Sequence, residues 1–189
     1  MKVSEKKYVS IIVLCFVIIV LGAGFVFMFL PRYPLEYKEE IEKCAKEFSL
    51  SPALVASVIN AESSFDKDCV SSQGAIGLMQ ILPSTATYIA KLLGENDFKT
   101  SQLFEPETNI RFGCFYLKYL QNKFENQNVS LSAYNAGEGT VKKWLSNQNY
   151  SEDGKTLVNI PYEETRNYIK KIENSYKHYE RKFHLNLQH

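Results

Sequence analysis

The sequence has few residues of the kinds that build metal sites. It contains three histidines and four cysteines in 189 residues, and neither a Cys-x-x-Cys nor a His-Glu-x-x-His motif occurs. His178, His184 and His189 gather near the C-terminus, where a solvated tail is the simpler interpretation than a zinc site. The sequence therefore predicts no metal.

A disulfide framework is also excluded by the small number of cysteines. Cys15 lies in an apolar run, which leaves Cys44, Cys69 and Cys114 for the rest of the chain. Three cysteines allow at most one bond within the chain. Cys44 and Cys114 share helical stripes with apolar residues, so we expect them to be small core residues. Cys69 could pair with either, but we predict free thiols.

An excess of positive charge is missing as well. The chain has 22 basic and 21 acidic residues, a formal net charge of +1. Three lysines and one glutamate of this total lie within the first thirty residues, so the remainder is slightly acidic. Because no basic stripe remains to bind a polyanion, the sequence does not support nucleic acid as a partner.

An uncharged apolar run is present from Val9 to Leu30. At about 1.5 Å per residue it can cross a hydrocarbon core of roughly 30 Å. Lysines precede it, so we predict a cytoplasmic segment 1–8, a transmembrane anchor 9–30, a linker 31–35 and an extracytoplasmic domain 36–189 of a single-pass cell-membrane protein. A cleaved secretory signal is the alternative, although the run exceeds the usual signal core of about 7–15 residues.

Helical periodicity dominates the exported part, and no strand-like alternation is sustained. The expected helices cover residues 36–48, 53–65, 83–93, a long segment from Pro106 to Phe124, 129–136, 140–145, and a last helix from Pro161. We expect residues 99–105 to be irregular, and the polar stretch 147–159 could hold a small hairpin. The predicted fold class is mainly α, one multi-helix domain.

One acidic residue lies on an apolar helix face. Ser51 can cap the helix from Ala53, and Glu62 falls on the same face as its apolar residues. Loss of hydration there would raise the pKa of Glu62 and keep it protonated near neutral pH. A loop with serines and glycines follows Phe65, which suits a ligand-binding rim. The competing interpretation is a paired structural carboxylate beside a simple connector.

Several motifs in this order resemble the SLT-type lytic transglycosylases, which have a lysozyme-like fold. The matching segments are Glu62-Ser63-Ser64-Phe65, Ser71 to Gln80, Pro83 to Ala86, Asn109-Ile110 with Gly113 and Tyr116-Leu117, Ala133 to Gly137, and Pro161 to Arg166 with Tyr168. Together they cover nearly all of 51–168. The resemblance implies cleavage of the β-1,4 bond between N-acetylmuramic acid and N-acetylglucosamine in peptidoglycan glycan strands, with 1,6-anhydromuramic ends as products. It implies no cofactor.

The resemblance also implies roles for particular residues. Glu62 would be the catalytic acid and then the base, because a transglycosylase can work with one carboxyl group where ordinary glycosidases use two. The expected substrate-binding residues are Ser71, Gly77, Met79, Gln80, Tyr134, Asn135 and Glu164. Loop capping for Ser71 and Gln80, and a helix-dipole role for Glu164, are the structural alternatives, although Glu163 fits the dipole better.

Two other functions stay open at this point. A hydrolytic muramidase of the goose-lysozyme type would need a carboxylate or a feature of the fold that positions water. Asp66, Asp68 and Asp97 are the candidates for such a carboxylate, although all three are more naturally loop residues. The other is an inactive peptidoglycan-binding module. The short linker after the anchor suggests action close to the membrane, beside cell-envelope machinery.

Overall fold

The computed structural model describes Phe16 and residues 33–185, and the chain divides into two units, 1–32 and 33–189. The predicted anchor 9–30 lies outside the described residues except for Phe16. No helix in the described part is both long enough and apolar enough to span a bilayer. The second unit contains every element considered below.

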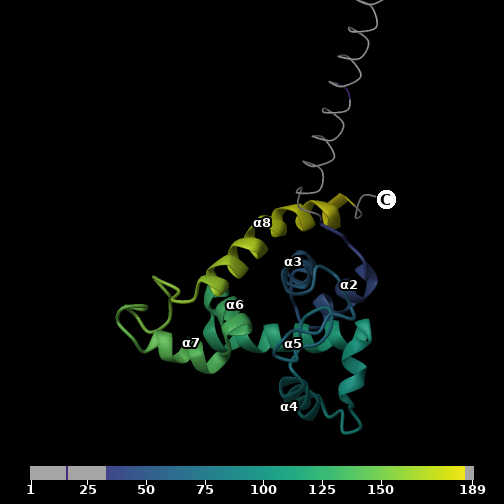
Figure 1. Cartoon of the computed structure of the whole chain (residues 1–189), viewed down its shortest axis with the longest axis horizontal. Helices are drawn as coiled ribbons and strands as arrows, with labels where there is room; N and C mark the ends of the chain where they lie inside the picture. Colours follow the sequence, from purple (N-terminus) through teal and green to yellow (C-terminus); the bar gives the residue numbers. More distant parts are fainter. Residues whose placement is uncertain (1–15, 17–32, 186–189) are drawn as a thin grey trace, which may run out of the picture. The chain divides into compact units, whose positions relative to one another are not determined.

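Helices make up the second unit, as predicted (Figure 1). In chain order they are α2 (Lys38–Glu47), α3 (Pro52–Glu62), α4 (Pro83–Leu93), the 3-10 helix η1 (Thr100–Phe104), α5 (Pro106–Phe124), α6 (Gln127–Ala136), α7 (Glu138–Leu145) and α8 (Glu163–Leu185). Between residues 33 and 185 the only β structure is two isolated bridges, which join Ile76 to Val70 and to Ile81. These bridges brace the loop between α3 and α4.

Local chemistry sets the ends of α4 as the sequence predicts. Pro83 occupies the first turn, where its missing N–H costs no hydrogen bond. Gly94 ends the helix in the left-handed region with φ 75°, which glycine adopts without a steric penalty. The predicted range 83–93 is confirmed.

The predicted end of α3 at Phe65 is wrong by one turn. The helix stops at Glu62, and Ser64 and Phe65 have positive φ angles of 54° and 69°. The Ser63 hydroxyl donates a 2.9 Å hydrogen bond to the Leu78 carbonyl, so it bonds to the loop. Glu62 is therefore the last helical residue, directly beside the turn into the loop.

Several other boundaries differ from expectation, among them the start of α7 at Glu138 instead of Thr140. Residues 99–105 contain η1 instead of irregular chain, and α6 begins two residues early because the Asn126 side chain caps it through Val129 N–H at 3.1 Å. The last helix begins at Glu163 rather than Pro161. Residues 147–159 form no hairpin, although Val158 N–H donates to the Tyr150 carbonyl at 2.9 Å.

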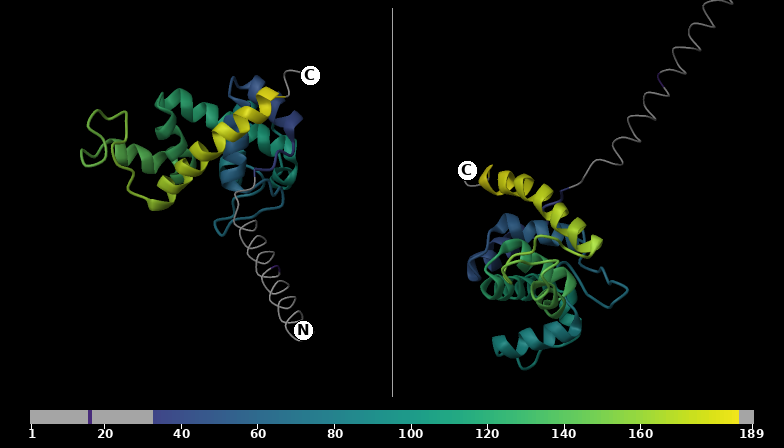
Figure 2. Two further views of the ribbon diagram at one scale, coloured as in Figure 1. Left: turned by 90° about the horizontal axis from the view of Figure 1, so that it is seen from above. Right: turned by 90° about the vertical axis from the view of Figure 1, so that its left-hand side faces the viewer.

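The packing of α3 fixes where Glu62 lies. All residues from Ala53 to Ile59 are buried, so α3 is a central helix with apolar contacts on every side. Its most extensive neighbour is α8, which crosses it at an angle (Figures 1 and 2). Each fully buried Val or Ile of this helix contributes about 1.5–3 kcal/mol of transfer free energy. A strongly held helix therefore presents the catalytic candidate at its C-terminal end.

The cysteine predictions are confirmed for the described residues. Cys44 and Cys114 are buried free thiols, and Cys69 is a partly exposed one. His178 differs from the expectation of a solvated tail, because its ring stacks on Tyr33 at 4.4 Å. The neighbouring Tyr179 hydroxyl donates to the Pro34 carbonyl at 2.9 Å. The C-terminal half of α8 thus holds the start of the domain.

Candidate active site

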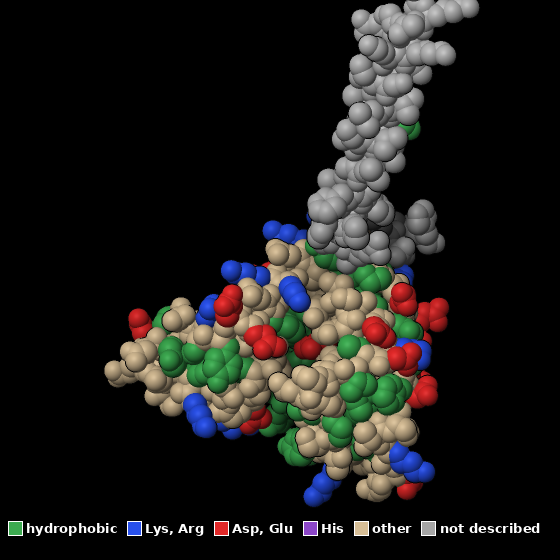
Figure 3. All heavy atoms as spheres, viewed as in Figure 1, with side chains coloured by type: hydrophobic (Ala, Val, Ile, Leu, Met, Phe, Trp, Pro, Cys, Tyr) green, Lys and Arg blue, Asp and Glu red, His purple; other side chains and the backbone are tan. Residues whose placement is uncertain are grey.

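A cleft of about 360 Å³ brings together segments that are far apart in the chain. Its walls come from the end of α3, the loop 71–82, the end of α6 and the start of α8. Six of the eight predicted site residues line it: Glu62, Ser71, Gln80, Tyr134, Asn135 and Glu164. Figure 3 shows acidic and hydrophobic side chains around a hollow on one face of the molecule.

Glu62 has the ionisation behaviour of a proton donor at neutral pH. Loss of hydration raises the pKa of its carboxyl from 4.5 to about 7, because burial disfavours the charged form. Tyr168 and Lys171 act in the opposite direction and lower this pKa, and the negative charge of Glu164 raises it. Near neutral pH the Glu62 carboxyl is therefore divided between acid and carboxylate, so it can both give and take a proton.

Tyr168 is a site residue whose role could not be predicted from the sequence. Its hydroxyl is buried and makes no hydrogen bond of normal geometry, yet its interaction with the Glu62 carboxyl lowers the pKa of Glu62. Burial of an unpaired hydroxyl costs free energy, so such groups need an explanation. The Tyr168 hydroxyl gains a partner when the ionised Glu62 carboxylate approaches it, and this explains its position. Helical periodicity placed Tyr168 on α8, but it could not reveal an unsatisfied hydroxyl.

Tyr134 and Asn135 join α6 to two other walls of the cleft. The Tyr134 hydroxyl donates to the Met79 carbonyl at 2.9 Å, and burial together with the charge of Glu62 raises the Tyr134 pKa well above 10. The Thr165 hydroxyl donates to Asn135 Oδ1 at 2.7 Å, which connects α8 to α6. Tyr134 therefore remains a neutral phenol. Tyr134 and Asn135 together hold the walls of the cleft in fixed positions.

Ser71 and Gln80 are partly used in holding their own loop. Ser71 Oγ accepts from Ala75 N–H at 3.0 Å and Gln73 N–H at 3.3 Å. Gln80 Nε2 donates to the carbonyls of Cys69 and Gly77 at 3.1 and 2.9 Å. The Ser71 hydroxyl proton and Gln80 Oε1 remain for a ligand. Loop capping and ligand binding are thus compatible for both residues.

Met79 and Gly77 are not among the residues that line the cleft. The Met79 side chain is fully buried and packs so closely on Gly113 that a Cβ there would lie 2.7 Å from Met79 Cβ. Gly77, with φ 77°, lies where a Cβ would meet the Leu103 carbonyl at 2.5 Å. Both residues therefore pack beneath the cleft rather than line it, and their contact with substrate stays a prediction.

Asn109, a motif residue for which no role was predicted, explains this close packing. Its Oδ1 accepts from Met79 N–H at 2.8 Å, and its Nδ2 donates to the carbonyls of Ile76 and Leu103, both at 2.8 Å. The side chain is buried at the start of α5. A polar residue on an otherwise apolar helix face was the available signal. Asn109 holds the loop that carries Gln80.

The aspartates considered for positioning water lie elsewhere. Asp66 Oδ1 accepts from Asp68 N–H at 3.0 Å, and the Asp68 carboxylate pairs with Lys67. Neither these two nor Asp97 lines the cleft, whose acidic residues among the described part of the chain are Glu62 and the exposed Glu164. The geometry thus offers one enclosed carboxyl group, as the sequence predicted.

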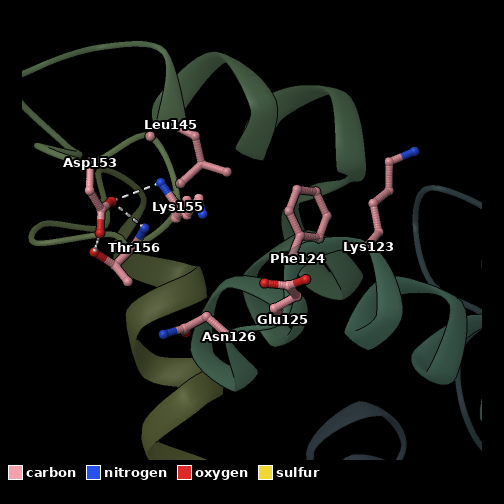
Figure 4. Close-up of a pocket in the computed structure, with 9 residues that line it drawn as sticks. Lys123, Phe124, Glu125, Asn126, Leu145, Asp153, Lys155 and Thr156 are labelled. Atoms are coloured by element: carbon pink, nitrogen blue, oxygen red, sulfur yellow. Dashed lines mark hydrogen bonds between the residues drawn. The ribbon is translucent and has the colours of Figure 1, made fainter.

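A larger hollow of about 490 Å³ lies between the end of α5, the end of α7 and the loop 153–156 (Figure 4). Its Asp153 carboxylate accepts from the backbone N–H groups of Lys155 and Thr156, both at 2.7 Å. These bonds hold the pKa of Asp153 well below its usual range. A carboxylate satisfied in this way stabilises its own loop and is a poor proton donor. The smaller cleft is the better active-site candidate.

The site can now be compared with known proteins. Residues 39–157 match the Transglycosylase SLT domain. The soluble lytic murein transglycosylase of Salmonella typhimurium is 38% identical over 144 residues, which cover 75% of this chain and 22% of that protein. The membrane-bound lytic murein transglycosylase C of Serratia proteamaculans is 28% identical over 169 residues, 78% of this chain and 47% of that protein.

A solved structure agrees with these sequence matches. It is an inactive glutamate-to-glutamine mutant of the lytic transglycosylase Slt from Pseudomonas aeruginosa, with a TM-score of 0.72 and 31% identity over 81% of this chain and 25% of that chain. The chain thus spans about a quarter or less of the length of the Salmonella and Pseudomonas proteins. Its helical domain has the lysozyme-like SLT fold, and the chain belongs to the transglycosylase SLT family.

Proposed function

We propose that this chain is a lytic transglycosylase that cleaves peptidoglycan glycan strands between N-acetylmuramic acid and N-acetylglucosamine. The observation that carries the proposal is the half-buried carboxyl of Glu62 in the cleft. Loss of hydration raises the pKa of this carboxyl to about 7. The matched relatives are named as murein transglycosylases. A glutamate-to-glutamine change accompanies inactivity in the Pseudomonas enzyme, which supports a glutamate as the central group.

The proposed reaction uses Glu62 twice. Its acid form donates a proton to the glycosidic oxygen as the bond from that oxygen to the muramic C1 breaks. The C6 hydroxyl of the same muramic ring then attacks C1, and the Glu62 carboxylate accepts the hydroxyl proton. The product is a 1,6-anhydromuramic end, and no water is consumed. The attacking oxygen belongs to the substrate, so it is present at high effective concentration without a second carboxylate.

The other cleft residues support this chemistry by position. Ser71 and Gln80 offer one donor and one acceptor toward sugar hydroxyl or acetamido groups, because their remaining bonds hold the loop. Tyr134 and Asn135 keep α6 against the loop and α8. Glu164 is exposed at the rim, where its charge favours the protonated form of Glu62. We propose that it contacts sugars rather than the reacting atoms.

We further propose that segment 9–30 anchors the enzyme in the cell membrane and that the domain lies outside the cytoplasm. The uncharged run and the preceding lysines support this placement, and one matched relative is named as membrane-bound. Resistance of the full chain to carbonate extraction, with protease access to the domain only from the outer side, tests it. Action beside cell-envelope machinery is part of the same proposal.

A direct test of the activity uses a matched pair of glutamates. Parent protein should solubilise purified peptidoglycan sacculi. Glu62→Gln should lose at least about 10³-fold of this activity, because it removes the enclosed acid of the cleft. Glu163→Gln is the control, since Glu163 is exposed on α8 and does not line the cleft. Equal clearing by Glu62→Gln and parent would refute catalysis by Glu62.

A further inference from the structure

A third hollow, of about 400 Å³, is lined almost entirely by hydroxyl-bearing side chains. We call it the tyrosine groove. Its residues are Ser84, Thr85 and Tyr88 from α4, Tyr116 and Tyr119 from α5, and Glu138 at the start of α7. Three helices therefore hold it. Ser84, Thr85 and Tyr116 belong to the motifs described above, but the proposed chemistry at Glu62 does not use the groove.

The three tyrosines form one array of rings. Tyr116 and Tyr119 stack with 6.1 Å between centroids and 12° between planes, and Tyr88 meets Tyr119 edge-on at 6.4 Å. Tyr88 is 46% exposed despite this contact. An exposed aromatic face beside a hollow presents apolar area that a flat ligand can cover. Sugar rings have such a face, made of their axial C–H groups.

The polar groups of the tyrosine groove are held in place by ion pairs. Glu138 Oε1 accepts from both Lys123 and Lys142 at 2.7 Å, and the Tyr119 hydroxyl donates to Glu138 Oε2 at 3.3 Å. Burial alone would raise the pKa of Glu138, but these two lysines outweigh it and lower the pKa. The carboxylate is thus a fixed acceptor beside aromatic rings. Acceptors and hydroxyl groups beside rings suit a ligand with many hydroxyl groups.

The tyrosine groove lies beside the cleft that contains Glu62. Leu82 lines the cleft and Ser84 lines the groove, two residues apart, and the same spacing separates Ala136 from Glu138. The ring of Tyr134, a cleft residue, lies 5.6 Å from that of Tyr116, a groove residue. The two hollows therefore lie next to each other at the start of α4 and at the junction of α6 and α7, although no residue lines both.

We propose that the tyrosine groove binds sugar rings of the same glycan strand, several units away from the bond cut at Glu62, with Tyr88 as the stacking platform. The inference rests on the proposed function, since it takes the strand in the cleft as its ligand. The groove gives the enzyme a preference for long strands over short oligomers. A stem peptide in the groove is the other possibility, and the test below distinguishes it.

The test measures binding on the Glu62→Gln protein, so that turnover does not consume the ligand. The probes are glycan oligomers of increasing length, freed of stem peptides, titrated by calorimetry. Long oligomers should bind more tightly than short ones, and adding Tyr88→Ala should remove about tenfold of affinity for the long oligomers only. Tyr88→Phe should keep the affinity because the ring remains. Leu92→Ala, an equally exposed change on the same helix, is the control.

Two results would overturn the assignment. Unchanged affinity of Tyr88→Ala for long oligomers would show that the tyrosine groove takes no sugar. A loss seen only with strands that carry stem peptides would assign the groove to peptide. Failure of the proposed function is a separate outcome, because it appears as undiminished cleavage by Glu62→Gln whatever the binding data give. Tyr88 is exposed, so melting temperatures should confirm that its variants fold.

Discussion

The Tyr134 hydroxyl donates a 2.9 Å hydrogen bond to the backbone carbonyl of Met79. This bond joins α6 to the loop that carries Gln80, across 55 residues of sequence. The Met79 side chain is fully buried below, and its N–H is held by Asn109 Oδ1 at 2.8 Å. The loop beside Glu62 is therefore fixed from both sides before a substrate arrives, which is the preorganisation that a catalytic site requires.

Replacing Tyr134 by Phe should lower both the stability of the fold and the catalytic activity. The change keeps the ring but leaves the Met79 carbonyl without its donor, at a cost of about 1–3 kcal/mol in unfolding free energy. We expect kcat/KM on glycan strands to fall by about 10–100-fold because the loop with Gln80 loses its fixed position. Denaturant unfolding and steady-state rates measure the two effects. Parent-like values of both would contradict a positioning role.

Replacing Tyr168 by Phe should shift the pH profile of activity to higher pH. Tyr168 lowers the pKa of Glu62, so its removal raises that pKa and keeps the carboxyl protonated to higher pH. The basic limb of the kcat/KM profile, expected near pH 7 for parent, should shift to higher pH. Tyr176→Phe is the control, because the Tyr176 hydroxyl contacts Ser51 rather than the cleft. A basic limb that stays at the same pH, or moves to lower pH, would refute the interaction between Tyr168 and Glu62.

Replacing Glu164 by Gln should have the opposite effect. The negative charge of Glu164 raises the pKa of Glu62, so its loss should move the basic limb to lower pH. Because Glu164 is exposed, the shift should be small and should shrink as ionic strength rises. The same pH profiles, recorded at low and high salt, measure it. A shift toward higher pH would contradict the electrostatic assignment.

Glu62→Gln should stabilise the fold at alkaline pH. The pKa of Glu62 is raised from 4.5 to about 7 in the folded state, so the folded chain holds a proton that the unfolded chain releases over that window. Parent stability therefore falls as pH rises from about 4.5 to 7, while the neutral amide is unaffected. Above pH 7.5 the variant should be more stable by about 3 kcal/mol, and at pH 4 the two should match. Thermal melts across pH measure this. A variant less stable than parent at pH 8 would contradict the burial of Glu62.

Local chemistry allowed much of this structure to be predicted. Proline and glycine mark the two ends of α4. The spacing of apolar residues identified α3, α5 and α8, because each of these helices buries at least one stripe of apolar side chains. The end of α3 was misplaced since Ser64 and Phe65 adopt positive φ to enter a loop that Ser63 ties to Leu78. That bond is a tertiary contact, so no local pattern contains it.

The residues of the candidate site also fall into those that could be predicted from local sequence and those that could not. Glu62 could be predicted because a carboxyl on an apolar helix face is itself an unusual pattern. Met79 was predicted to line the cleft but its side chain packs beneath it, since a loop sequence does not tell which side chain turns inward. Tyr168 and Asn109 lie in helices whose pattern was recognised, but their importance comes from partners on other elements. The tyrosine groove likewise needs three helices to assemble.

The central claim is that one carboxyl group, Glu62, cleaves the strand while the muramic C6 hydroxyl takes the place of water. Mass spectrometry of the fragments released from purified sacculi tests it most directly. Parent protein should yield fragments with 1,6-anhydromuramic ends, one water lighter than reducing ends, and Glu62→Gln should yield neither kind. Reducing ends as the main product of the parent would contradict the account, because they require a water that the proposed chemistry does not use.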